Sequence, residues 1–554
     1  MRTAAVLMEI LRQSGVRHLF GNPGTTELTF LDALPDSGLE YIVALQEATA
    51  VAAADGYAQA SGQVGIVNVH VAPGVANSLS ILHNAARAKT PLLLTAGQQD
   101  TRFLMHDPIL SGDLVQLTEQ FTKWSYEIRR ADEAPSALRR ALKLALTPPT
   151  GPVFLSLPMN LMSETVEDSG AAAPVLAART RPDASALEQA AEILSGARAP
   201  VIIAGDGVAR ASAMSELVAL AEAIGARVHA EPLFRRANFP GDHPLWRSGL
   251  FPSPPAIRKG LEGADALLIV GANVFTGLLF TPGEPFPRGL SVIQIDDDAR
   301  EIGRSHAPTL GIVADPRIAL AELTSAIRAR QTTAAREAAA ARVSELGQAR
   351  AAQSKRVHAA AEAERERVPI SQAHLMRTLA AVAPRDVAVV DESATSLPCV
   401  LRYLPFSTQG SFYGSKTGTL GWAMGAALGV QLASPGRKVV ATIGDGSVMY
   451  SPQALWTAAR YRLPVTYVVP NNSSYAILKS GMLTLGLDSA KRDIYPGMDL
   501  VDPEIDYLSL ARALGVRAER VDKPDILGDV LRACLDHPGP ALVDVAIDRS
   551  FKAM

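Results

Sequence analysis

Short apolar runs alternate with helical stretches along nearly the whole chain, and this alternation constrains the possible folds more than any other feature. Runs such as VGIVNVH, PLLLTAG and PVIIAGDG are rich in Val, Ile and Leu and are separated by segments with helical spacing of apolar residues. Strands that are buried on both faces have this composition, and their alternation with helices is typical of parallel sheets covered on both sides. The sequence therefore predicts an α/β protein built from doubly wound parallel sheets.

The alternation falls into three units of similar size, which we expect to be three domains. The first occupies residues 1–165, the second residues 183–330 and the third residues 366–554. Residues 166–182 have no clear period and contain Pro and Gly, as linkers do. The Ala-rich, charged tract 332–367 is prone to form a helix, and we expect an exposed connector there. A chain of 554 residues is too long for one hydrophobic core, which agrees with several domains.

Composition and charge argue against several classes of function. The net charge of -3, with 20% charged residues, gives no basic face, so we expect no nucleic-acid partner. No segment is apolar enough to span a bilayer, and the amphipathic N-terminal stretch does not read as a signal peptide, so we expect no membrane partner. Cys399 and Cys534 lie far apart without metal-ligand spacing, which fits a reducing, cytoplasmic compartment.

Polar side chains follow two successive strand-like runs of the third unit. Asp445 lies in GDGS after KVVATI, and Asn472 lies in NNSS after LPVTYVVP, 472 − 445 = 27 residues later. One strand–helix–strand crossover spans that distance, so both side chains can reach one edge of a sheet. A carboxylate, an amide oxygen and a main-chain carbonyl suit Mg²⁺ and leave positions for phosphate oxygens. Either motif alone is more typical of a turn, but the pair predicts a diphosphate anchored through magnesium.

Glu47 raises a separate question, because it lies between apolar residues in the helical stretch VALQEATAVAAADG. Burying an unpaired charge costs on the order of several kcal/mol. Either the side chain lies at the surface, or it holds a proton and shares it with another group. The residues alone leave both alternatives open.

These segments resemble the thiamine diphosphate enzymes of the 2-oxo acid decarboxylase and acetolactate synthase superfamily, and within it most closely the benzoylformate decarboxylases. The resemblance is carried by GNPGTTEL, ALQEA, ADGYAQAS, TAGQQ, KWSYE, GDGS and NNSSYAIL, and it covers nearly the whole chain. It implies a pyrimidine-binding, a middle and a diphosphate-binding domain, with thiamine diphosphate and Mg²⁺ as cofactors. It also implies a homo-oligomer in which two subunits share each active site, and the family suggests a tetramer of such subunits.

The resemblance assigns roles to particular residues. Glu47 would contact the aminopyrimidine ring and share a proton with it. Leu420 would bend the cofactor so that its two rings face each other, although ordinary packing before a helix explains it as well. His70 would either transfer protons or orient a substrate carboxylate, and Thr25 stands where the family has a substrate-binding serine. The implied Mg²⁺ ligands are Asp445, Asn472 and the main-chain oxygen of Ser474. The other implied cofactor contacts are Ser393, Thr395, Gly444, Gly446, Ser447, Tyr475 and Ile477.

The chain departs from the family pattern in the middle unit and in the substrate region. Leu278 stands where the benzoylformate decarboxylases have a second catalytic histidine, and an apolar side chain cannot relay protons. His106 could replace it, but a solvated loop histidine is the favoured interpretation. Ile477 and Gly481 stand in place of a small and an aromatic residue, so the accepted acyl group is expected to differ from benzoyl. The stretch AGDGVARASA is too weak a glycine motif to predict a flavin.

The expected activity is non-oxidative decarboxylation of a 2-oxo acid to an aldehyde, dependent on thiamine diphosphate and Mg²⁺. A first alternative is a carboligase or aldehyde lyase that forms or cleaves acyloins, which the loss of the second histidine favours somewhat. Its small-molecule substrate would be a 2-oxo acid or an aldehyde. A second alternative is a catalytically silent homologue that only binds the cofactor, against which the intact Glu47, Asp445 and Asn472 argue.

Overall fold

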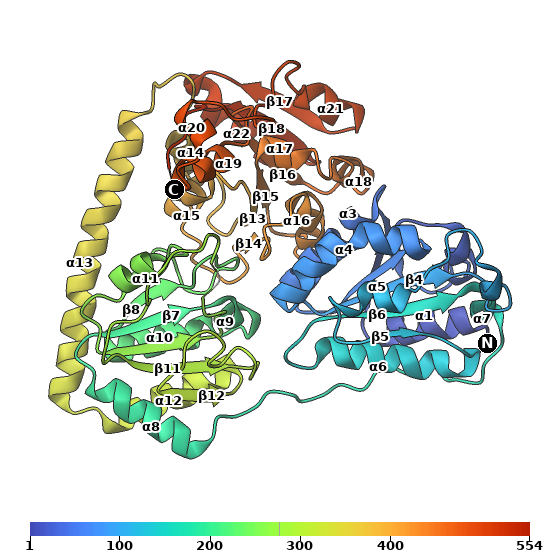
Figure 1. The fold of residues 1–554 in the computed structure, drawn as a ribbon, viewed down its shortest axis with the longest axis horizontal. Helices are drawn as coiled ribbons and strands as arrows, with labels where there is room; N and C mark the ends of the chain where they lie inside the picture. Colours follow the sequence, from blue (N-terminus) through green and yellow to red (C-terminus); the bar gives the residue numbers. More distant parts are fainter. Residues whose placement is uncertain (276, 554) are drawn as a thin grey trace. The chain divides into compact units, whose positions relative to one another are not determined.

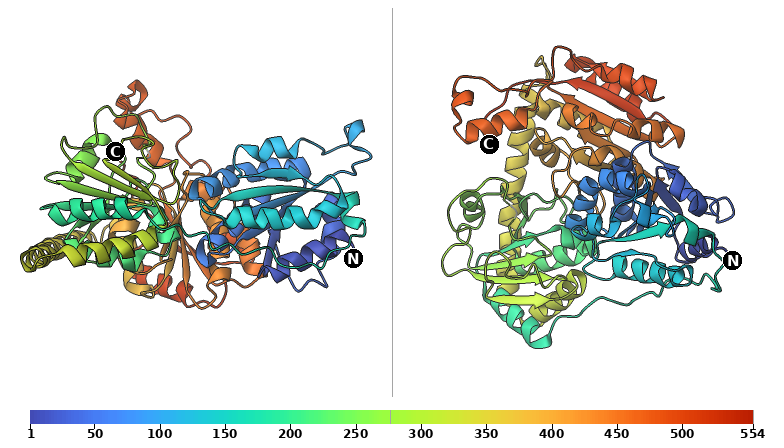
Figure 2. Two further views of the ribbon diagram at one scale, coloured as in Figure 1. Left: turned by 90° about the horizontal axis from the view of Figure 1, so that it is seen from below. Right: turned by 45° about the vertical axis from the view of Figure 1, so that its right-hand side comes forward.

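The computed structural model describes residues 1–275 and 277–553 and contains three six-stranded parallel sheets flanked by helices (Figure 1). Figure 2 shows this layering for the first sheet, which has helices on both of its faces. The predicted α/β class with doubly wound parallel sheets is therefore confirmed. The three sheets lie within residues 18–158, 200–313 and 388–546. The limits of the three domains stay predictions.

The chain folds into two compact units. The first consists of Met1–Leu176, Glu364–Val400 and Ser415–Met554, and the second of Ala177–Ala363 and Leu401–Gly414. The residues predicted to form the site all lie in the first unit, apart from Leu278.

The first sheet has the strand order β2-β1-β3-β4-β6-β5. Its strands are β1 His18–Gly21, β2 Glu40–Val43, β3 Gly65–Val69, β4 Leu92–Gln98, β5 Ser125–Glu127 and β6 Pro152–Pro158. The accompanying helices are α1 Thr3–Gln13, η1 Thr25–Glu27, α2 Leu28–Leu31, α3 Glu47–Ser61, α4 Val71–Ala88, η2 Leu104–His106, α5 Leu114–Glu119, η3 Ala131–Glu133, α6 Ala134–Leu146 and α7 Met159–Ser163.

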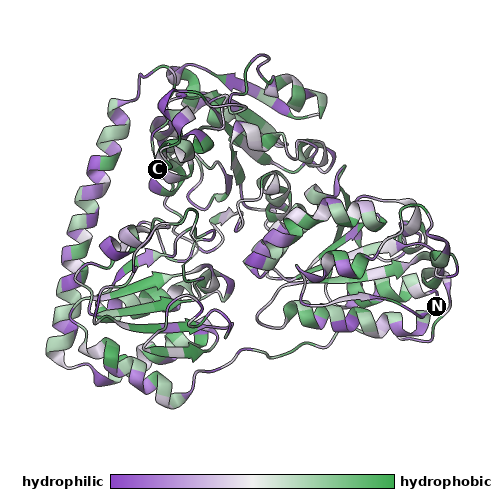
Figure 3. Ribbon diagram, in the orientation of Figure 1, coloured by the Kyte–Doolittle hydropathy of each residue, from purple (hydrophilic) through white to green (hydrophobic). Residues whose placement is uncertain are grey.

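The second sheet has the order β12-β11-β10-β7-β8-β9. Its strands are β7 Pro200–Ala204, β8 Arg227–Ala230, β9 Trp246–Gly249, β10 Ala266–Val270, β11 Ser291–Asp296 and β12 Leu310–Val313. The helices of this region are α8 Ala184–Gly196, α9 Asp206–Arg210, α10 Met214–Ile224, α11 Pro254–Gly260, α12 Pro316–Arg330 and α13 Thr333–Ala363. Only Ala339 and Ala361 of α13 are buried, as the charged tract predicted. Figure 3 shows the contrast between this mixed helix and the hydrophobic strands beside it.

The third sheet has the order β14-β13-β15-β16-β18-β17. Its strands are β13 Ala388–Glu392, β14 Phe412–Gly414, β15 Val439–Ile443, β16 Val465–Asn471, β17 Arg517–Val521 and β18 Ala541–Ala546. Its helices are α14 Gln372–Val382, α15 Leu397–Tyr403, α16 Trp422–Ala433, α17 Asp445–Val448, α18 Ala454–Arg460, α19 Ala476–Thr484, α20 Asp488–Lys491, α21 Tyr507–Ala513, η4 Pro524–Ile526 and α22 Leu527–Leu535.

Inside the first unit, α3 and α16 pack so closely that their backbones touch. A Cβ atom added to Gly429 would lie 1.8 Å from the carbonyl oxygen of Ala53, and one on Gly56 would lie 2.2 Å from that of Ala426. The Ala-rich run at the start of α3 therefore serves close helix packing as well as apolar burial. This contact fixes the helix that begins with Glu47.

None of the helices in the described part of the chain is both long and apolar enough to cross a bilayer.

Candidate active site

Glu47 is the first residue of α3, and its side chain is buried, with 8% of the residue exposed. Its Oε1 accepts a hydrogen bond from Nδ2 of Asn22 at 3.4 Å, and its Oε2 accepts one from Nδ2 of Asn77 at 3.0 Å. The side chain is therefore not at the surface, and the shared proton stays a prediction. Neutral amides orient the carboxyl group without an opposite charge, so it can share a proton with a further group.

A second buried acid, Glu27, is a site residue that the sequence analysis missed. Its Oε2 lies 2.7 Å from Nδ1 of His70, at the carboxyl end of β3. Its Oε1 accepts from the backbone N–H of Gly97 at 2.7 Å and from the hydroxyl of Thr26 at 2.9 Å. Glu27 belongs to the GNPGTTEL segment, but nothing in its spacing pairs it with a histidine 43 residues later. His70 is therefore held by a carboxyl group that is itself fixed.

Two glycines allow this close approach. A Cβ on Gly24 would lie 2.0 Å from Nδ1 of His70, and one on Gly97 would lie 2.3 Å from Oε1 of Glu27. The next residue after His70, the buried and β-branched Val71, has a φ of 41°. A left-handed conformation is strained for such a residue and tends to occur at functional sites. The close approach of Gly24 to His70 and the strained backbone of Val71 both support a functional role for His70.

The hydroxyl group of Tyr41, on β2, is buried at the same end of the first sheet and has no hydrogen-bond partner among the described residues. Burial raises the pKa of Tyr41, and the charges of Glu27, Tyr461 and Glu47 act in the same direction. The phenol therefore stays neutral, and its proton is available to a group bound beside the two acids. An unsatisfied buried donor of this kind fits a ligand-binding site.

Thr25, Leu278 and His106 remain without a demonstrated role. Thr25 is exposed, in η1, next to the buried Thr26. Leu278 is 61% exposed, and its segment includes Thr276, which lies outside the described residues. The exposed His106 ends η2 with its ring 5.8 Å from that of Phe103. The surroundings of His106 agree with a solvated loop histidine.

Asp445 and Asn472 meet at the carboxyl ends of β15 and β16, which are neighbours in the third sheet. Asp445 accepts from the backbone N–H of Gly446 at 2.8 Å and from that of Asn472 at 3.1 Å. The amide oxygen of Asn472 accepts from the backbone N–H of Ser474 at 3.1 Å. Burial raises the pKa of Asp445, and these backbone donors oppose the rise. The structure thus brings together the three residues that the sequence predicted as ligands.

The donor set fits Mg²⁺ with a diphosphate. It would combine one carboxylate, one amide oxygen and one main-chain carbonyl, all of them the hard oxygen ligands that Mg²⁺ prefers. A Cβ on Gly446 would lie 2.3 Å from the ring of Tyr475, so the two predicted cofactor contacts touch and the glycine leaves the backbone accessible. Among the described residues, no group of three or more His, Cys, Asp or Glu side chains is placed to hold a metal ion. A metal here would therefore depend on a single carboxylate.

The end of β13 holds two more acids. Asp391 accepts from the hydroxyls of Ser393 at 2.5 Å and Thr442 at 2.7 Å. Glu392 accepts from the backbone N–H groups of Gly421 at 2.5 Å and Ala423 at 2.7 Å, at the start of α16. Burial raises the pKa of Glu392 to about 8, against the effect of these backbone donors. Glu392 was not singled out from the sequence, and it secures the turn just after Leu420.

The remaining predicted cofactor contacts follow the ends of β13, β15 and β16. Gly444 directly precedes α17 and Ser447 lies within it, Thr395 follows β13, and Ile477 lies in α19 after β16. Their contacts with a cofactor stay predictions.

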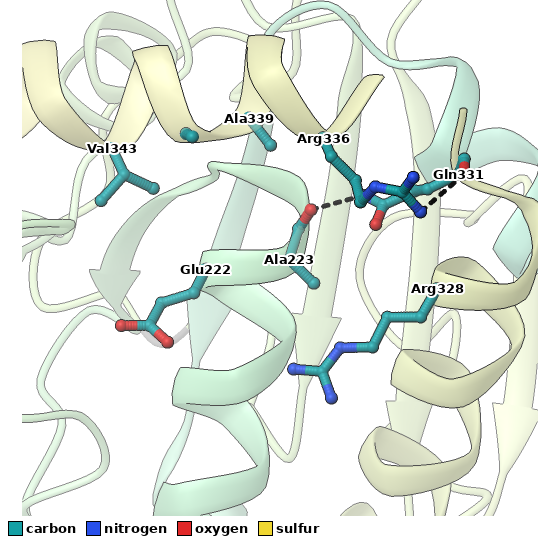
Figure 4. Close-up of a pocket in the computed structure, with 8 residues that line it drawn as sticks. Glu222, Ala223, Arg328, Gln331, Arg336, Ala339 and Val343 are labelled. Carbon is teal, nitrogen blue, oxygen red and sulfur yellow. Dashed lines mark hydrogen bonds between the residues drawn. The ribbon is translucent and has the colours of Figure 1, made fainter. Parts of the chain in front are cut away.

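A cavity of 560 Å³ lies elsewhere, in the second unit, against α10, α12 and α13 (Figure 4). It is lined by Glu222, Ala223, Arg328, Gln331, Arg336, Ala339, Ala340 and Val343. The side chain of Gln331 donates to the carbonyl of Ala223 at 2.5 Å, and Arg336 donates to the carbonyl of Gln331 at 3.3 Å. None of the predicted site residues lines this cavity, so it is separate from the candidate active site.

Comparison with protein families gives three matches along the chain. Residues 1–117 match the N-terminal TPP binding domain of thiamine pyrophosphate enzymes, residues 187–323 match their central domain, and residues 395–545 match their C-terminal TPP binding domain.

Individual relatives match over the whole length. A benzoylformate decarboxylase of Pseudomonas aeruginosa is 33% identical, over 97% of this chain and 97% of its own. A glyoxylate carboligase of Escherichia coli O157:H7 is 26% identical, over 99% of this chain and 92% of its own. The solved structure of a thiamine diphosphate-dependent 4-hydroxybenzoylformate decarboxylase of Rhodococcus jostii RHA1 superposes with a TM-score of 0.88 at 30% identity, covering 99% of this chain and 100% of that one.

Proposed function

Because the chain belongs to the thiamine pyrophosphate enzymes, we propose that it catalyses the non-oxidative decarboxylation of a 2-oxo acid to an aldehyde. The observation that carries the proposal is the pair of acids at one end of the first sheet. Glu47 is buried with neutral partners, and Glu27 holds His70 at 2.7 Å. One acid is suited to activate a cofactor, and the held histidine is suited to move protons at a substrate.

The proposed cofactors are thiamine diphosphate and Mg²⁺. Asp445, Asn472 and the main-chain oxygen of Ser474 would hold the metal with the diphosphate, and Glu47 would contact the pyrimidine ring. When bound, thiamine diphosphate supplies an electron sink for the negative charge that loss of carbon dioxide leaves on the substrate.

The protein's own groups would hold and move protons. Glu47 would share a proton with a pyrimidine nitrogen, while Asn22 and Asn77 keep its carboxyl group in place. His70 would give a proton to the reacting carbon, and Glu27 would orient the imidazole and balance its charge after proton uptake.

Carboligation is the second candidate. If Leu278 stands in place of a catalytic histidine, as the family resemblance implies, delivery of a proton to the reacting carbon would be slower, which would leave more time for attack on a second carbonyl group. Similarity to a glyoxylate carboligase over 99% of the chain supports this alternative.

One assay separates the candidates. Protein loaded with thiamine diphosphate and Mg²⁺ is incubated with benzoylformate, 4-hydroxybenzoylformate, pyruvate and glyoxylate, and carbon dioxide, aldehyde and acyloin are measured together. Aldehyde equal to the carbon dioxide released supports the decarboxylase, and acyloin as the main product supports the carboligase. A silent homologue would release no carbon dioxide and would not accelerate exchange of the cofactor's thiazolium proton.

We also propose a homo-oligomer, a dimer or tetramer, because the family resemblance implies that each cofactor molecule is bound between two subunits. Light scattering after size exclusion would measure the mass, and a monomer with full activity would contradict the proposal. A cytoplasmic location stays a prediction from the cysteine usage.

A further inference from the structure

Residues 415–421, which carry Leu420, contain neither helix nor strand and lead directly into α16. Gly418 and Gly421 have φ values of 72° and 85°, so the backbone here uses conformations open mainly to glycine. Glycine-rich irregular backbone loses much conformational entropy when it is fixed. The position of Leu420 must therefore be maintained by contacts from outside this segment.

Asn84, a fully buried residue of α4, holds the beginning of the segment. Its Oδ1 accepts from the backbone N–H of Lys416 at 2.7 Å and from that of Thr417 at 3.3 Å. The hydroxyl of Ser415 donates to the same oxygen at 3.2 Å. One amide oxygen thus accepts hydrogen bonds from three consecutive residues.

Asp55, a fully buried residue of α3, connects Asn84 with the start of α16. Its Oδ2 accepts from Nδ2 of Asn84 at 2.9 Å and from the indole N–H of Trp422 at 2.7 Å. Its Oδ1 accepts from Nε2 of Gln59 at 2.9 Å. Because Asn84 donates to Asp55, its oxygen must face the segment. A single carboxyl group therefore fixes both ends of the stretch that carries Leu420.

Packing alone does not explain an acid at this position. Burying a carboxyl group is costly even when it is hydrogen-bonded, and an apolar residue of similar size would fill the space between helices at lower cost. The arrangement instead uses both carboxyl oxygens as acceptors from three different side chains. Such a buried polar network specifies one geometry for the groups it connects.

We propose that Asp55 is a positioning residue which, through Asn84 and Trp422, keeps Leu420 in the place required to bend the cofactor. The inference rests on the proposed function, since it assumes that thiamine diphosphate lies against Leu420. Glu392 completes the arrangement by holding Gly421 and Ala423.

The test compares Asp55→Leu with Asp55→Asn in the full-length protein. Asparagine keeps one oxygen for Asn84 and Trp422, and the Gln59 amide can turn to accept from its nitrogen, so the anchor is retained. Leucine removes every acceptor. Trp422→Phe removes one hydrogen bond and keeps most of the ring, which covers the case in which Asp55→Leu does not fold. Gln59→Leu is the matched control, because Gln59 donates to Oδ1 of Asp55, whereas Asn84 and Trp422 donate to its Oδ2.

The first measurement is hydrogen exchange of the backbone amides of residues 415–422 without cofactor. Exchange is expected to become about tenfold faster, or more, in Asp55→Leu and Trp422→Phe, and to stay unchanged in Gln59→Leu. This readout is independent of any activity. Unchanged protection in both Asp55→Leu and Trp422→Phe would overturn the anchoring role.

The second measurement is the exchange rate of the thiazolium proton in bound thiamine diphosphate with Mg²⁺. We expect it to fall about tenfold or more in Asp55→Leu and to return to within about threefold of wild type in Asp55→Asn. A merely structural role would lower the melting temperature of Asp55→Leu and Gln59→Leu alike without slowing this exchange, and that result overturns the inference. If the wild-type protein neither binds the cofactor nor accelerates the exchange, the proposed function fails, while the amide measurement still decides the anchor.

Discussion

At the scale of single residues, the two buried acids Glu47 and Glu27 have different partners. Glu47 is held by two neutral amides, whereas Glu27 faces the ring of His70. An acid among neutral donors can gain or lose a proton without breaking an ion pair, and an acid beside histidine balances the charge of the protonated ring. The two carboxyl groups are therefore not interchangeable.

Glu47→Gln is expected to lower kcat by at least about 100-fold, because glutamine accepts and donates hydrogen bonds but cannot share an acidic proton. Steady-state assays and thiazolium proton exchange would both measure the loss. The melting temperature should change little, since the amide oxygen still accepts from one of the asparagines Asn22 and Asn77, and the other can turn its own oxygen toward the new amide nitrogen. Wild-type turnover in this variant would remove Glu47 from the mechanism.

Glu27→Gln is expected to lower kcat/KM about tenfold or more, because His70 loses its charged partner while the amide oxygen can still accept from Gly97. The same substitution made in a His70→Phe background should change kcat/KM by less than about threefold, since residues that act as a unit are not additive. Equal effects in both backgrounds would show that Glu27 acts independently of His70.

At the scale of elements, the start of α16 depends on Glu392. Its carboxyl group has a folded-state pKa of about 8, above the ordinary 4.5 that applies in the unfolded chain. The stability contributed by the neutral form is fully present below pH 4.5 and is lost as the pH rises through 8. Alkaline conditions should therefore loosen the turn that follows Leu420.

The unfolding free energy of the wild type relative to Glu392→Gln should fall as the pH rises from 5 to 8, by at most about 1.4 kcal/mol per pH unit. Thermal or urea unfolding of both proteins across this range would measure the difference. A constant difference would mean that the carboxyl group stays ionised and that the backbone N–H donors outweigh burial.

The packing of α3 on α16 makes a second prediction. Gly429→Ala should destabilise the protein by about 1–3 kcal/mol, because a Cβ would lie 1.8 Å from the carbonyl oxygen of Ala53 and overpacking outweighs the better helix propensity of alanine. Gly436→Ala is the control, since no atom lies within 4 Å of its added Cβ. Equal melting temperatures for both variants would contradict the close helix contact.

For the whole molecule, binding of thiamine diphosphate with Mg²⁺ should raise the melting temperature, since a ligand at 100 times its Kd adds about 2.7 kcal/mol of stability. A chelator should reverse most of the rise. Asp445→Asn should abolish it, because the proposed metal would lose its single carboxylate ligand. A full thermal shift in Asp445→Asn would show that the metal is bound elsewhere.

The parallel α/β fold and the strand-end turns followed from local patterns. Apolar runs and helical periods are properties of neighbouring residues, and one crossover is enough to bring Asp445 to Asn472. The connector α13 was predictable for the same reason, because its charges leave no apolar face to bury. These features can be predicted without knowing the order of the strands in the three sheets.

The amino-acid sequence by itself determined the α/β class, predicted the candidate metal turn and marked Glu47 as an acid next to an apolar run of the chain. Only the tertiary structure decided what those residues touch. Glu27 meets His70 across 43 residues, and Asp55 meets Trp422 across 367. Such partners depend on which strands become neighbours and on how closely two helices approach, and no local period records either choice.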